Sequence, residues 1–138
     1  MAAESPHAPP TPPDEFEITI PLRVEFATTL RTVVAGIGSD AGFSLDELDD
    51  LRLALSEVFS VLAETAALGQ RARVSCSMVP GKLSISVSSD PPGVSIELDD
   101  LATRILQSVV DDVTIDTDTD IVTFSKRSIE LGEPSRRA

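Results

Sequence analysis

The chain has 138 residues, the size of one domain, and 41% of them are hydrophobic, which is enough for a buried core. Its formal net charge of -12 repels phosphate backbones and anionic membrane surfaces, so direct binding to nucleic acid or to a membrane is not expected. No apolar run approaches the ~20 residues of a membrane span, and the first residues lack a signal pattern. We therefore expect a cytoplasmic protein.

The single cysteine and the single histidine exclude several classes of site. Cys76 cannot form a disulfide within the chain, and its alternating, strand-like surroundings predict a buried, unreactive thiol. His7 lies among prolines near the start, so the folded part has no histidine for a Ser-His-Asp triad or a Cys-His zinc site. The Gly-x-x-x-x-Gly-Lys-Ser/Thr phosphate loop is also missing, and we predict no metal site.

The first predicted elements are a leader, a strand and a helix. Residues 1–14 contain five prolines and little apolar surface, which predicts a disordered leader. Apolar and polar residues alternate over 16–22, which predicts a strand, and Pro21 marks a sheet edge or the end of that strand. Apolar residues then recur on one helical face over 26–37, which predicts a first helix.

The longest helical pattern begins at about residue 45. Its apolar residues recur at three- and four-residue steps and form one stripe: Leu45, Leu48, Leu51, Leu55, Val58, Phe59 and Leu62. Ser44 and Glu47 have the spacing of a capping box, in which each side chain accepts a hydrogen bond from the other residue's backbone amide. Gly69 is predicted to end the helix by adopting a left-handed conformation after the last turn.

A hairpin and a short helix follow. Apolar residues alternate over 74–78 and again over 83–87, and Pro80-Gly81-Lys82 between them predicts a turn. The polar, proline-containing stretch 88–93 ends the second strand. Leucine, isoleucine and valine then recur at helical spacing over 98–109, which predicts a third helix.

A second hairpin closes the predicted domain. It pairs 113–115 with 121–124 across a turn at 117–120, and the polar residues 129–138 are predicted to form a flexible tail. The element order lets the helices cover one face of a largely antiparallel sheet. The sequence therefore predicts an α/β fold, a two-layer α/β sandwich, over residues 15–128.

An acidic residue, Glu57, interrupts the apolar pattern of the longest helix in the segment Leu53-Ala-Leu-Ser-Glu-Val-Phe-Ser-Val61. This segment, the preceding run from Leu48 and the strand Ile18-Thr-Ile-Pro-Leu22 resemble the bacterial anti-sigma factor serine kinases of the GHKL (Bergerat-fold) ATPase superfamily. The resemblance covers about residues 16–127 and is strongest in the helix. It implies the same two-layer fold.

The resemblance also implies a nucleotide site whose motifs are damaged in this chain. Glu57 matches the family's general base, but Val61 replaces the asparagine that holds magnesium, and valine has no oxygen to offer that cation. Asp90 and Gly93 match part of the segment that recognises adenine, although prolines are inserted between them. The family's second glycine-rich segment is replaced by Asp99-Asp-Leu-Ala-Thr-Arg104, whose carboxylates repel a triphosphate. We therefore expect a degenerate member with a vestigial base and no cofactor.

By this resemblance, the protein sequesters an alternative sigma factor by protein binding. It implies a homodimer and release by an anti-anti-sigma protein of the STAS type. The acidic net charge suits a basic partner surface. The residues at which we expect the partner to bind lie on the first helix, in the following loop and at the start of the long helix: Arg31, Ser39, Asp40, Phe43, Asp46 and Asp49.

Two other functions remain open at this point. An active serine kinase would bind Mg-ATP and phosphorylate an anti-anti-sigma antagonist, with Glu57 and Asp90 sufficient despite an altered metal site. An adaptor domain would use the same sandwich for an unrelated partner, because a fold does not determine a function.

Several of these residues also have ordinary structural interpretations. Glu57 can be a partly exposed helical residue that pairs with a lysine or arginine. The acidic residues 46–50 can be a solvated first turn that complements the helix dipole. Asp116, Asp118 and Asp120 imitate the opening of a calcium loop, but the glycine and glutamate that such a loop requires are absent, so we predict a hairpin turn there.

Overall fold

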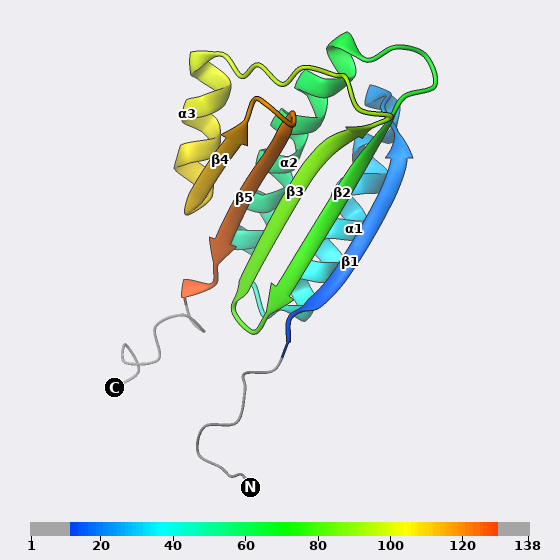
Figure 1. The fold of residues 1–138 in the computed structure, drawn as a ribbon. Helices are drawn as coiled ribbons and strands as arrows, with labels where there is room; N and C mark the ends of the chain where they lie inside the picture. Colours follow the sequence, from blue (N-terminus) through cyan, green and yellow to red (C-terminus); the bar gives the residue numbers. More distant parts are fainter. Residues whose placement is uncertain (1–11, 130–138) are drawn as a thin grey trace, which may run out of the picture.

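Five strands form one antiparallel sheet in the order β1-β2-β3-β5-β4 (Figure 1). The computed structural model describes residues 12–129. The strands are β1 (Asp14–Pro21), β2 (Arg71–Val79), β3 (Lys82–Asp90), β4 (Asp112–Asp116) and β5 (Ile121–Arg127). All four pairings between neighbouring strands are antiparallel.

Three α-helices cover one face of this sheet, and the other face is open (Figure 1). They are α1 (Ala27–Asp40), α2 (Leu45–Thr65) and α3 (Asp100–Val109), and the short 3-10 helix η2 (Val24–Phe26) precedes α1. The predicted two-layer α/β sandwich is therefore confirmed. No helix within residues 12–129 is long and apolar enough to cross a membrane.

The core lies between α2 and the inner face of β2, β3 and β5. Alternate residues of β2 and β3 face the helices, so Val74 and Ile85 have no exposed surface, whereas the serines between them face the open side. The apolar stripe of α2 packs against them from Leu48 onward, with Leu55 and Leu62 fully buried. Leu45, which was predicted to belong to the stripe, is 78% exposed. Cys76 is 2% exposed within this layer, as predicted, and burial raises the pKa of its thiol to about 11.

The start of α2 is as predicted, but its end is not. Ser44 Oγ accepts from the Glu47 amide at 3.2 Å and Glu47 Oε1 accepts from the Ser44 amide at 2.8 Å, which completes the capping box. The helix ends at Thr65, and Ala66 leaves it in an extended conformation. Gly69, with φ of +90°, lies in the turn before β2, so its predicted role as the helix stop was wrong. Its left-handed backbone turns the chain into the sheet instead.

The other predicted boundaries differ from the observed ones by a few residues. β1 is an edge strand that ends at Pro21, as its proline predicted. In the second hairpin, Val113 pairs with Phe124 as expected. Asp14 already belongs to β1, although the leader was predicted over residues 1–14. The rest of that predicted leader, apart from Pro12 and Pro13, and the predicted tail after Ile129 lie outside the described residues.

Candidate functional site

The C-terminal half of α2 and the segment between β3 and α3 form the walls of an open groove of about 410 Å³. This connecting segment runs from the end of β3 past α2 to α3 (Figure 1). The residues that line the groove are Val61, Glu64, Thr65, Gly93, Val94, Ser95 and Glu97. The groove brings together two of the segments in which the family resemblance predicted nucleotide contacts.

Glu57 and Val61 lie one turn apart on α2, and both side chains are half-buried. Val61 lines the groove, where it presents methyl groups and no metal ligand. Glu57 is not among the lining residues, and its carboxylate forms no hydrogen bond or salt bridge with any residue of 12–129. Within that range, the lysine or arginine partner of the ordinary interpretation is therefore absent. The same described residues contain no cluster of carboxylates, histidines or cysteines that could hold a metal ion.

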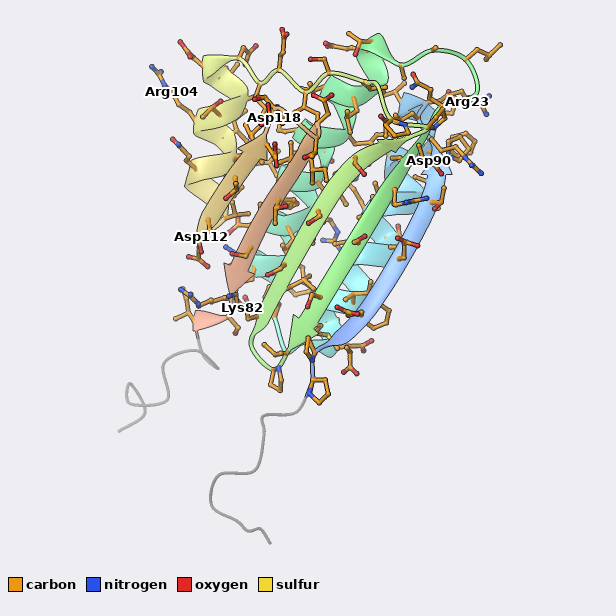
Figure 2. All side chains as sticks on the ribbon, in the orientation of Figure 1. Arg23, Lys82, Asp90, Arg104, Asp112 and Asp118 are labelled. Carbon is orange, nitrogen blue, oxygen red and sulfur yellow. The ribbon has the colours of Figure 1, made fainter. Side chains whose placement is uncertain are left out.

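The carboxylate of Asp90 is directed away from this groove. Asp90 pairs across the sheet with Arg71, and its Oδ2 atom lies 3.3 Å from Nη2 of Arg71 and 3.4 Å from Nη2 of Arg73. Those arginines lie on the open face of β2, because Ala72 between them is fully buried against the helices. Figure 2, in which the helices lie behind the sheet, labels Asp90 at the end of β3. In this arrangement Asp90 serves an ion-pair network on the opposite face.

The residue that does face the helical layer is Ser89. It is 7% exposed, and its hydroxyl accepts a hydrogen bond from the Val94 amide at 3.2 Å. This bond holds the start of the connecting segment against β3. Gly93, for which a nucleotide contact was predicted, lines the groove, and its φ of +128° is a backbone conformation that residues with a side chain rarely adopt.

The start of α3 has no free cradle for a phosphate. The Asp99 carboxylate accepts from the Ala102 amide at 2.8 Å and is the N-cap of the helix. Its backbone carbonyl accepts from the Thr103 amide at 2.9 Å. A phosphate would have to displace the Asp99 side chain and approach Asp100, which also lies in the first turn. The family's use of backbone amides at this position is therefore blocked by a side chain of this chain.

The residues predicted for partner binding lie in different environments. Ser39 and Asp40 are exposed at the end of α1, and Asp46 is exposed at the start of α2. Arg31 is half-buried, since its guanidinium donates to Ser56 Oγ on α2 at 3.1 Å.

Two members of the predicted surface need separate comment. Asp49 is exposed and forms a 2.6 Å ion pair with Arg52 one turn further along α2. Phe43 is only 7% exposed and packs in the core, so it does not present its ring to a partner. The sequence predicted a partner contact for Phe43, but burial of its ring anchors the α1–α2 loop instead.

Sequence reasoning missed several polar residues with clear structural roles. Glu64 and Glu97 form opposite walls of the groove. The spacing of seven residues after Glu57 could have placed Glu64 on the same helical face, but no local signal marks Glu97. Lys126 was also missed: its Nζ atom donates to the Val109 carbonyl at 2.7 Å and lies 3.1 Å from Asp50, which joins β5 to α3 and α2.

Comparisons with known proteins concern the sequence and the fold of the chain. No family model matches the chain. It is 26% identical over 95 residues to proteins named serine-protein kinase RsbW from Bacillus cereus strain AH187 and from Bacillus anthracis. This match covers 67% of the chain and 58% of each relative, so the chain spans less than two thirds of their length.

A solved structure shares the fold. It contains the RsbU and RsbW domains of Rv1364c from Mycobacterium tuberculosis and superposes with a TM-score of 0.57 at 18% identity, over 86% of this chain and 32% of that one. The chain thus shares the α/β-sandwich fold of that structure. The chain is similar in sequence to proteins named serine-protein kinase RsbW, and this similarity confirms the family resemblance that the sequence suggested.

Proposed function

We propose that this protein is an anti-sigma factor-like regulator that sequesters an alternative sigma factor by binding it, without catalysis. The observation that carries the proposal is the state of the nucleotide site: Val61 stands at the metal position, Asp90 pairs with arginines on the other face, and Asp99 caps α3. Phosphoryl transfer depends almost entirely on positioning and on charge stabilisation of the phosphates. Loss of all three contributions favours a binding role.

The proposed partners follow from the relationship to RsbW and from the charge. An alternative sigma factor carries basic, DNA-binding surface, which a protein of net charge -12 would attract and steer. A STAS-type anti-anti-sigma protein would release it, and the regulator would act in the cytoplasm as a homodimer without contacting nucleic acid or membrane. The exposed part of the partner surface would be Ser39, Asp40, Asp46 and Asp49, with Arg31 beside them and Phe43 beneath.

A calorimetric titration with ATP, with and without magnesium, tests the loss of the nucleotide site. We expect no saturable heat up to millimolar ATP for the wild-type chain, because metal ligand, adenine contact and phosphate cradle are all missing. Val61→Asn should not restore binding by itself, because Asp90 and Asp99 remain as they are. Saturable, magnesium-dependent binding by the wild type would contradict the proposal.

Sequestration itself is tested by mixing the purified chain with each alternative sigma factor of its own cell. Size-exclusion chromatography should show one sigma factor that elutes with the chain, equally with and without ATP. If no sigma factor binds, the proposed function is wrong.

An active serine kinase is the second candidate, because Glu57 is retained one turn from the groove and the named relatives are serine-protein kinases. This alternative predicts magnesium-dependent transfer of phosphate from ATP to a serine of a STAS-type antagonist. Glu57→Gln would then abolish phosphate transfer. The fold would remain, because the carboxylate of Glu57 forms no hydrogen bond with the described residues.

A further inference from the structure

The groove beside α2 has a chemical character opposite to that of a triphosphate site. Glu64 stands on the α2 wall and Glu97 on the wall formed by the connecting segment. Half-buried Val61 provides the exposed apolar surface between them, because Val94 is only 3% exposed. Among residues 12–129, no lysine or arginine lines the groove.

The two carboxylates are not neutralised by neighbours in the described part of the chain. Neither Glu64 nor Glu97 forms a side-chain hydrogen bond or a salt bridge with residues 12–129. Other acids in that range have cationic partners, such as Asp90 with Arg71. The groove therefore presents uncompensated negative charge above an apolar surface.

The surroundings strengthen this charge. Because β3 and β5 are antiparallel, the β4–β5 turn lies at the same end of the sheet as the connecting segment, and Figure 2 labels Asp118 there. Figure 2 labels two cations at this end: Arg104, whose side chain points outward from α3 and away from the sheet, and Arg23, which lies 3.7 Å from Glu25. Neither arginine lines the groove. The local field thus favours a cation over an anion.

We propose that this groove receives the side chain of a lysine or arginine from the protein partner. The alkyl stem would pack on Val61, as long basic side chains do on apolar surface, and the cationic group would lie between the two glutamates. This assignment rests on the proposed function, since it names where basic surface of a sequestered sigma factor would enter. The family's anionic ligand is thus replaced by a cationic one at the same place in the fold.

A titration of the isotope-labelled full chain with an acetylated, amidated tetralysine peptide, followed by NMR at low salt, tests the proposal. We expect saturable shifts confined to the backbone amides of 61–65 and 93–97. The double variant Glu64→Gln/Glu97→Gln should weaken binding about 5- to 30-fold, since two exposed ion pairs are lost. The matched control Glu15→Gln/Glu17→Gln on β1 removes the same charge away from the groove and should change the affinity less than about twofold.

Shifts spread over the whole acidic surface, or an equal loss in the control variant, would overturn the groove assignment. A second measurement separates this failure from failure of the proposed function. If a sigma factor binds the wild type and the Glu64→Gln/Glu97→Gln variant equally well, the groove assignment is wrong and sequestration stands. If tetralysine binds in the groove but no sigma factor binds the chain, the assignment stands and sequestration is wrong.

Discussion

Glu47 connects the start of α2 to the residues just after β5. Its Oε1 atom accepts from the Ser44 amide, and its Oε2 atom accepts from the Ile129 amide at 2.8 Å, although 82 residues separate the two partners in sequence. Burial alone raises the pKa of this carboxyl. The hydrogen bonds from the Ser44 and Ile129 amides and from the Ser44 hydroxyl outweigh that effect and hold the pKa below 4.5.

We expect Glu47→Gln to lower the free energy of unfolding by about 1–2 kcal/mol at pH 7, because a buried charged acceptor is lost. A folded-state pKa below the unfolded value stabilises the protein above pH 4.5, and this contribution disappears as the pH falls through the folded-state pKa. Urea unfolding between pH 7 and pH 3 should therefore show a flatter pH dependence in the variant. Glu15→Gln, at an exposed position, is the control, and an unchanged pH profile in Glu47→Gln would contradict the assignment.

Cys76 gives a second prediction at the scale of one residue. Burial raises the pKa of its thiol from 9.0 to about 11, and only the thiolate reacts rapidly. We expect a colorimetric thiol reagent to leave the native protein unmodified at pH 8 for as long as it stays folded, and to react fully in denaturing urea. Rapid reaction in the native state would mean that the layer around Cys76 opens readily.

The pairing of α1 with α2 depends on one glycine. A Cβ atom at Gly38 would lie 2.7 Å from Leu48 Cδ2 and 3.2 Å from Leu51 Cδ1, both in side chains of the buried core. Gly36, two residues earlier in the same helix, has nothing within 4 Å of such an atom. The two glycines therefore form a natural pair for separating helix propensity from close packing.

We expect Gly36→Ala to stabilise the protein by about 0.5–1 kcal/mol, because alanine is the better helix former. Gly38→Ala should destabilise it by about 1–2 kcal/mol, because the added methyl group overpacks the contact with α2. Chemical denaturation of both variants measures the difference. A Gly38→Ala protein as stable as Gly36→Ala would show that the helices adjust without cost.

The net charge of -12 belongs to the whole molecule and controls its encounters more than its fold. The exposed acids at the α1–α2 end give the proposed sigma complex its attraction. Reversal of Asp40, Asp46 and Asp49 to lysine should weaken that complex about 10-fold or more at low salt and flatten its salt dependence. Affinity measured between low and physiological salt tests this, and unchanged affinity in the triple variant would remove that surface from the assignment.

Local patterns in the sequence determined the elements and the fold class. The strand alternation of 74–87, the apolar stripe of the long helix and the capping box at Ser44 involve residues that are neighbours within one element, so their periodicity is visible without the fold. The family resemblance, and not periodicity, marked Val61 as the position at which a metal ligand was expected. The burial of Cys76 followed from strand alternation in a chain with one cysteine.

Only the tertiary structure determined which side chains line the groove and which point elsewhere. In the folded chain, Asp90 pairs with Arg71, the ring of the loop residue Phe43 is buried, and Glu97 lies across the groove from Glu64. These outcomes depend on sheet register and on how the connecting segment packs against α2, contacts between residues far apart in the chain. Local periodicity cannot encode such contacts, because they result from the free energy of the whole packed core.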